Sequence, residues 1–136
     1  PLYLTLHKWQ SMAHVWGLSD CMTVICDWCV ENGHHDPLGD LRWGYDSAIS
    51  CQKLTGYLTD PLSVCAAQFE GVAGLKRGNA LNAGDVGVVR RRDDPRFAYG
   101  MLWTGHSWAG LGESGAVTVD ASMVEVLAFW SVGYEA

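Results

Sequence analysis

VWGLSDCMTVICDWCVENG, residues 15–33, holds three of the five cysteines of the chain and predicts its central helix. On a helix over residues 20–32, one face carries a row of apolar and thiol side chains, whereas Asp27 and Glu31 mark a solvated face. The buried row consists of Cys21, Ile25, Trp28 and Cys29. We therefore expect a helix that packs into the core and carries Cys21 in its first turn.

Further helices are predicted on both sides of this segment, from periodicity and from capping residues. A repeat at helical spacing precedes it and ends at Gly17: Leu6, Trp9, Ala13 and Trp16. We expect the central helix to begin after Ser19 or Asp20 and to end at Gly33. A third helix should begin after Asp46 or Ser47 and end at Gly56, and Pro61 should occupy the first position of a short fourth helix.

The second half of the chain changes from helical periodicity to short strand patterns separated by glycines. The strand candidates are residues 84–89, 97–103, 107–111, 116–119 and 126–132. GESG at 112–115 is a hairpin signal. Helices followed by a run of strands predict an α+β fold, with N-terminal helices packed on a small antiparallel sheet. We expect one domain over 1–136, helical over about 1–70 and β over about 84–134.

Composition and charge narrow the classes of function. Nearly half of the 136 residues are hydrophobic and seven are tryptophan, as in a packed globular domain. The net charge is −6, and the one basic run, RRRDDPR at 90–96, is diluted by acidic residues. We therefore expect no binding of nucleic acid.

The compartment is inferred from the N-terminus and from the cysteines. The chain begins with Pro1 and reaches Lys8 without a long apolar core, so we expect no signal peptide. No apolar run approaches the roughly 20 residues of a membrane span, so we expect no membrane insertion. An odd number of cysteines in a reducing cytoplasm is expected to remain as free thiols or ligands.

Position along the central helix separates its three thiols. Cys21 lies where backbone N–H groups are unpaired and the helix dipole is positive, which favours a thiolate and predicts a lowered pKa. Cys26 and Cys29 lie further along the helix and are expected to pack in the core like small apolar residues.

Two other interpretations of Cys26 and Cys29 stay open. As a Cys-x-x-Cys pair they resemble a redox motif, although such a pair normally begins a helix. Together with His34 and His35 they form a weaker candidate for a metal site, and Cys51 and Cys65 are candidates to join an iron–sulfur centre. We expect no cofactor.

Five motifs follow one another along nearly the whole chain: WGLSDCMTVICDW (16–28), DPLGDLRWGYDS (36–47), GDVGVV (84–89), YGMLWTG (99–105) and WAGLGESG (108–115). This ordered set resembles an uncharacterised phage and prophage family, which is similar to the NlpC superfamily of papain-like cell-wall peptidases. The resemblance implies a papain-like, NlpC-type fold with helices packed on a half-barrel of antiparallel strands.

The resemblance also implies candidate catalytic residues. In the superfamily, a cysteine at a helix start attacks an amide of the peptidoglycan stem peptide, and Cys21 matches that position. Gly84 and Asp85 match a structural marker. A histidine at the onset of the following strand is the base, but that position falls at Ala98 or Tyr99, so the base is not matched.

His106, in the strand half, is the candidate replacement base, and its alternative role is that of a turn residue facing water or a partner. With Cys21 as nucleophile, N–H groups at the start of its helix would help to hold the oxyanion. His14 is close enough in sequence to reach the same helix end.

Three functions follow, and whether the chain is an enzyme stays open. The first is a phage tail-tip or baseplate component of the virion, assembled in the bacterial cytoplasm, with a peptidase-like fold, a structural role and degenerate activity. The second is an active cysteine peptidase or amidase that cleaves stem peptides during genome entry. The third is a cysteine-ligated metal or iron–sulfur protein of the tail hub. The expected partners are other tail or baseplate proteins and, for the peptidase, peptidoglycan.

Overall fold

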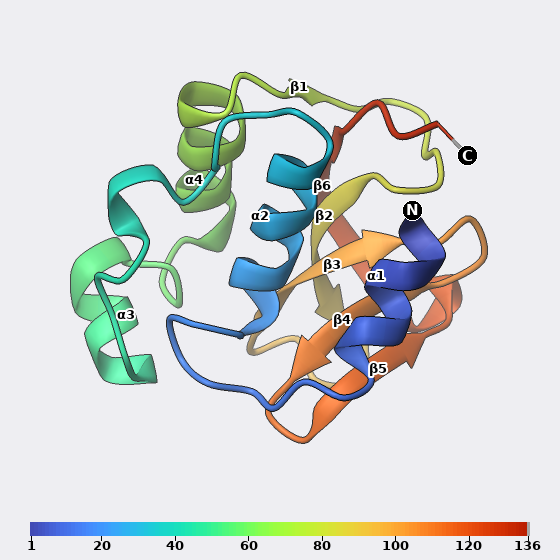
Figure 1. Cartoon of the computed structure of the whole chain (residues 1–136). Coiled ribbons are helices and arrows are strands. Elements are labelled where there is room, and N and C mark those ends of the chain that lie inside the picture. Colours follow the sequence, from blue (N-terminus) through green and yellow to red (C-terminus); the bar gives the residue numbers. More distant parts are fainter. Residues whose placement is uncertain (136) are drawn as a thin grey trace.

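The computed structural model describes residues 1–135 and has an α+β architecture (Figure 1). Most helices lie in the N-terminal half, and the strands form one sheet in the C-terminal half. The helical elements are α1 (Leu2–Trp9), α2 (Cys21–Glu31), η1 (Gly39–Leu41), α3 (Ala48–Thr55), α4 (Pro61–Ala66), η2 (Ala67–Val72) and η3 (Ala121–Met123). The predicted α+β class is confirmed.

The sheet has six strands in the order β1-β6-β2-β3-β4-β5, and every neighbouring pair is antiparallel. The strands are β1 (Lys76–Arg77), β2 (Val86–Arg91), β3 (Ala98–Trp103), β4 (Trp108–Gly112), β5 (Gly115–Val119) and β6 (Val124–Ser131). Strands β2 to β5 form a meander, and β6 returns to pair with β2. The short strand β1 lies between the expected helical and β parts of the chain.

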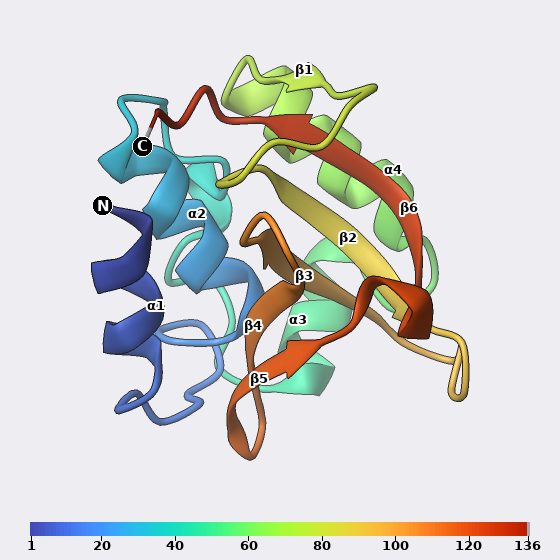
Figure 2. The same ribbon diagram turned by 90° about the vertical axis from the view of Figure 1, so that its right-hand side faces the viewer.

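The helices pack on one face of this sheet and form the main core with it. Alternation along the strands turns Val86, Val88 and Leu102 to this face, where they join Ile25 and Trp28 of α2 in one buried cluster. Trp28 also donates its indole N–H to the backbone oxygen of Gly84 at 2.8 Å. In Figure 2, α1 and α2 lie side by side against the curved sheet.

A second buried cluster covers the other face, from Val89, Met101, Trp108 and Val124. A Cβ atom at Gly87 would lie 2.9 Å from the Trp108 ring, so the indole packs directly on the glycine backbone. Both faces of the central strands are therefore buried, which explains why β2 reads as an almost continuous apolar run rather than an alternating one.

The predicted caps of the central and later helices are confirmed. Asp20 caps α2, and Gly33 follows its end with a positive φ of 90°. Ser47 caps α3, Gly56 ends it in the left-handed conformation, and Pro61 begins α4. These signals are local, since each cap satisfies backbone groups within three or four residues of itself.

The first helix is shorter than its sequence repeat predicts. It ends at Trp9, so Ala13 and Trp16 lie in the loop that leads to α2. In this loop Gly17 has a φ of 82°, and a Cβ atom there would lie 2.0 Å from the backbone oxygen of Tyr45. The close approach of a distant segment therefore determines the path of the loop. Among residues 1–135, no helix has the length and apolar character needed to cross a membrane.

Candidate active site around Cys21

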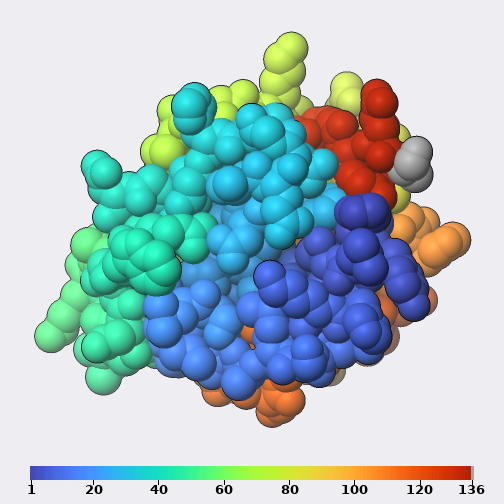
Figure 3. Space-filling view, in the orientation of Figure 1, coloured from blue at the N-terminus to red at the C-terminus, as the bar shows by residue number. Residues whose placement is uncertain are grey.

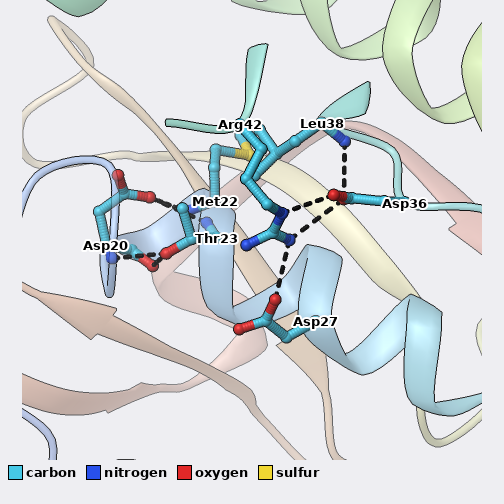
Figure 4. A network of polar contacts seen from close by, with 7 residues as sticks. All are labelled: Asp20, Met22, Thr23, Asp27, Asp36, Leu38 and Arg42. Atoms are coloured by element: carbon cyan, nitrogen blue, oxygen red, sulfur yellow. Dashed lines mark hydrogen bonds and ion pairs between the residues drawn. The ribbon is translucent and has the colours of Figure 1, made fainter. Parts of the chain in front are cut away.

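Asp20 organises the start of α2, where Cys21 is the first helical residue, as predicted. One oxygen of its carboxylate accepts hydrogen bonds from the backbone N–H groups of Met22 at 3.0 Å and Thr23 at 2.8 Å. The Thr23 hydroxyl in turn accepts from the backbone N–H of Asp20 at 2.7 Å (Figure 4). The result is a complete capping box on the helix that carries the candidate nucleophile.

The second oxygen of this carboxylate receives two donors from outside the helix. The backbone N–H of Gly17 donates to it at 2.9 Å, and the Tyr45 hydroxyl donates at 2.8 Å. Asp20 is only 2 % exposed, so all four hydrogen bonds are shielded from water. The N–H groups of Met22 and Thr23, expected to help a thiolate or an oxyanion at Cys21, are therefore already bonded to a carboxylate.

The pKa of the Cys21 thiol is raised to about 12. Burial is the largest cause and the adjacent Asp20 carboxylate is the next, while a hydrogen bond with the backbone of Gly100 acts in the opposite direction. The lowered pKa expected from the helix dipole is therefore wrong, because loss of solvation and a neighbouring negative charge outweigh the dipole. At neutral pH the thiol is protonated.

Besides the fully hydrogen-bonded Asp20 carboxylate, the groups near this thiol include the Cys51 thiol and the Tyr57 hydroxyl. Burial raises the pKa of Tyr57, and the Cys21 and Cys51 thiols add to that rise. The Tyr57 hydroxyl donates at 2.8 Å to the backbone oxygen of Ala98, one of the two strand positions, Ala98 or Tyr99, at which the sequence resemblance expects a base. A phenol with a raised pKa is a donor, so this neighbourhood offers Cys21 no acceptor able to remove its proton.

His106 is placed away from Cys21. It lies exposed in the turn between β3 and β4, where its backbone N–H donates to the Thr104 hydroxyl at 3.3 Å. Helix α2 runs along β3, and its first turn packs on Gly100. Two turns later, the Trp28 indole bonds to the backbone oxygen of Gly84, and the backbone N–H of Gly84 bonds to Trp103 at the end of β3. The turn lies beyond that end (Figure 1), so the two candidate catalytic residues are not brought together.

The turn that carries His106 lies beside a different hollow. A groove of about 450 Å³ separates α1 from strands β4 and β5, and Thr104 and Ser107 line it together with Tyr3 and His7 of α1. No residue of α2 is among its lining residues. The groove therefore does not join His106 to the thiol.

The histidines of the helical half serve other contacts. The ring Nε2 of His34 lies 2.7 Å from the backbone oxygen of Val132. The ring of His14 stacks edge-on against Trp16, with 5.1 Å between the ring centroids. Neither contact involves Cys21.

The structure does not bring together the four residues of the weaker metal candidate. Cys26 and Cys29 are buried in the core, as the simpler interpretation expected, while His35 is exposed and His34 is engaged with β6. Within the part of the chain that the structure describes, no group of three or more histidine, cysteine or acidic side chains could hold a metal ion. Cys26 and Cys29 also lie beyond the first turn of α2, whereas a redox Cys-x-x-Cys pair normally has its first cysteine at the start of a helix.

Arg42 joins the loop after α2 to the helix itself. Its guanidinium pairs with Asp36 and also with Asp27 of α2 at 2.8 Å (Figure 4). Figure 3 shows this face of the molecule covered by the first half of the chain, coloured from dark blue to green. Asp27 was predicted only to face solvent, and nothing in its local sequence identifies Arg42 as its partner.

The comparisons with known proteins identify one family. A family model described as a domain of unknown function, DUF6950, matches residues 2–132. No curated protein and no solved structure gave a match.

Proposed function

The chain belongs to the DUF6950 family, a domain of unknown function, and from the resemblance of its ordered motifs to a phage and prophage family we propose that it is a structural component of a phage tail tip or baseplate. In this proposal it has a papain-like, NlpC-type fold and a degenerate peptidase centre. It acts in the virion by binding other tail proteins, after assembly in the bacterial cytoplasm.

The single observation that carries the non-catalytic role is the state of the Cys21 thiol. Burial and the Asp20 carboxylate hold its pKa near 12, and the candidate base His106 lies in the exposed turn between β3 and β4. Attack on an amide requires either a depressed pKa or an adjacent base. A chain that keeps the cysteine at a helix start but lacks both conditions is suited to a structural use of the fold.

The arrangement of elements supports the NlpC-type part of the proposal. A cysteine begins the helix that packs on the sheet, and an antiparallel meander follows, in the order that the sequence resemblance implies. Asp85, in the structural marker motif, accepts from the backbone N–H groups of Asn82 at 2.9 Å and Val132 at 3.3 Å. It therefore ties the start of β2 to the end of β6, which is a purely structural task.

Exposed apolar side chains on the helical side support association with other proteins. Helix α3 contains no buried residue, and Ile49 on it is 71 % exposed. Trp43, in the preceding loop, is also 71 % exposed and has a positive φ of 68°, which is costly for a bulky residue. Large exposed apolar groups of this kind are typical of interaction surfaces.

Mass spectrometry of purified virions tests the tail proposal directly. Particles produced from the genome that encodes this chain should contain it at a fixed ratio to known tail proteins, after washing in high salt. A double variant, Trp43→Ser with Ile49→Ser, should be depleted from the particles. The surface variant Lys53→Ser, on the same helix, is the matched control and should be retained. Absence of the wild-type chain from intact particles would refute the proposal.

One observation supports the peptidase alternative: Cys21 begins a helix that packs on an antiparallel sheet. It is tested by incubating the pure chain with peptidoglycan and analysing the released muropeptides. We expect no release. Release by the wild type that is lost in both Cys21→Ala and His106→Ala would establish the enzyme and overturn the non-catalytic role.

A further inference from the structure

The arginine-rich segment at the end of β2 divides into paired and unpaired guanidinium groups. Arg91 binds the Asp93 carboxylate through two hydrogen bonds, of 2.9 and 2.6 Å, and Arg96 binds Asp94 in the same way, at 2.8 and 3.1 Å. Arg90 and Arg92 form no ion pair with any residue of the described range 1–135. The acidic residues therefore neutralise only part of the basic run.

The unpaired arginines line one surface pocket. Its volume is about 200 Å³, and its lining residues are Arg90, Arg91, Arg92, Pro95 and Glu125. The sheet register places Arg90 directly opposite Ala98 of β3 and Glu125 of β6, so these three side chains point to the same face. The pocket lies at the edge of the sheet where β2 ends and β3 and β6 begin.

Arg90 contains a buried donor without an acceptor. Its Nε atom is shielded from solvent, and no acceptor within residues 1–135 bonds to it. A buried, unsatisfied polar group destabilises a fold, and a charged one more so, which is why such groups are rare in folded proteins. Because this nitrogen has no solvent-accessible surface, a ligand oxygen in the pocket bonds to it only once the Arg90 guanidinium turns toward the pocket.

We infer that this pocket binds an oxyanion, either phosphate or carboxylate, with Arg90 as the principal ligand and Arg92 as the second cation. The Nε–H and a terminal N–H of a guanidinium form a planar fork that matches two oxygens of either group. Arg91 contributes little charge, because Asp93 already occupies its fork. The inference is independent of the proposed tail function, since it concerns the opposite end of β2 from the structural marker motif.

Glu125 is the acidic residue among those that line the pocket. Its carboxylate lines the same pocket and lies across from Arg90, yet it forms no ion pair with it in the described structure. Its negative charge opposes the entry of an anion. Removing that charge should therefore strengthen anion binding.

The test is an NMR titration of the whole chain with sodium phosphate and, separately, with sodium acetate at matched ionic strength. The Arg90 Nε–Hε signal, identified by its absence in Arg90→Lys, should shift and saturate. Saturation with phosphate but not acetate identifies a phosphate site, and the reverse identifies a carboxylate site. A signal that moves with neither salt overturns the inference.

Four variants distinguish the site from general charge attraction. Arg90→Lys, which keeps the positive charge but lacks the fork, should weaken binding about tenfold, as expected for a lost charged hydrogen bond. Arg92→Gln should also weaken binding, and it serves as the second probe if Arg90→Lys is unstable. Glu125→Gln should tighten binding severalfold. Arg96→Gln, outside the pocket and paired with Asp94 in the wild type, should leave it unchanged. Equal loss in Arg96→Gln and Arg92→Gln would overturn the site.

Discussion

The Tyr45 hydroxyl donates a hydrogen bond of 2.8 Å to the Asp20 carboxylate, although 25 positions separate the two residues in the chain. The same carboxylate caps α2 and holds the backbone N–H of Gly17. One buried anion therefore joins three segments: the loop before α2, the start of the helix, and the loop before α3. After burial, which is the larger cause, its charge is the next to raise the pKa of the neighbouring Cys21 thiol.

Asp20→Ala should destabilise the fold by about 3 kcal/mol or more, because it removes a helix cap and leaves the buried donors of Gly17 and Tyr45 without an acceptor. Urea denaturation followed by circular dichroism measures the change. Tyr45→Phe, which removes only one of the four hydrogen bonds, should cost about 1 kcal/mol. If Asp20→Ala lowered the free energy of unfolding by less than about 1 kcal/mol, the central role of this carboxylate would be contradicted.

Stability should decline as the pH rises above 9. The pKa of Cys21 is raised from 9.0 to about 12, so its contribution to stability is complete below the ordinary value and is lost progressively between the two. Each thiol of this kind contributes a slope of up to about 1.4 kcal/mol per pH unit. Denaturation at a series of pH values should show a shallower decline for Cys21→Ala than for the wild type. If the stabilities of the wild type and Cys21→Ala fell in parallel above pH 9, ionisation of Cys21 would not be the cause of the decline.

Alkylation of Cys21 by iodoacetamide near neutral pH should be slow in the folded chain, because the thiolate is the reactive form. We expect a rate at least about tenfold below that of the same residue in urea, measured by peptide mass spectrometry. Asp20→Asn removes the second largest cause of the raised pKa and should accelerate the reaction if the variant stays folded. Fast labelling of the wild type would instead favour the peptidase alternative.

Gly100→Ala should destabilise the packing of α2 on β3 by about 1–3 kcal/mol, the usual cost of overpacking a core. The added Cβ atom would lie 2.7 Å from the Met22 sulfur and 2.9 Å from the Ile25 Cδ1 atom. Combining it with Met22→Ala should recover part of the loss, so a double-mutant cycle in urea should be non-additive. Gly71→Ala, which meets no atom within 4 Å, is the matched control and should be close to neutral.

Arg42→Lys should cost about 1–2 kcal/mol, because lysine cannot form the paired hydrogen bonds that hold Asp36 while also reaching Asp27. Thermal unfolding measures the loss. The comparison variant is Arg96→Lys, whose pair with Asp94 is largely exposed and should contribute under about 1 kcal/mol. Similar losses in the two variants would indicate that the Arg42 network is no stronger than a surface ion pair.

Local signals account for the parts of the fold that could be predicted. Asp20, Ser47, Gly56 and Pro61 define helix ends through bonds or backbone angles within a few residues, and all four were identified from the sequence. The strands from β2 onward were located to within two residues at most of their ends, because Gly and turn residues separate them. The position of Cys21 at a helix start follows from the same local reasoning.

Long-range contacts account for what was missed. The first helix ends at Trp9, whereas its repeat continues to Trp16, because the following loop is held by Asp20 and by close contact with Tyr45. Strand β1 exists only through its pairing with β6. The sequence contains the Arg42 and Asp27 charges but nothing that predicts their pairing.

The order of elements, the α+β class and the presence of a cysteine at the first turn of a core helix were determined by the amino-acid sequence alone, since hydrophobic period and capping chemistry are local properties. The acidity of that cysteine and its separation from His106 were decided only by the tertiary structure. A thiol pKa depends on how completely folding removes water and which charge folding brings near, and helix position alone predicted the wrong sign.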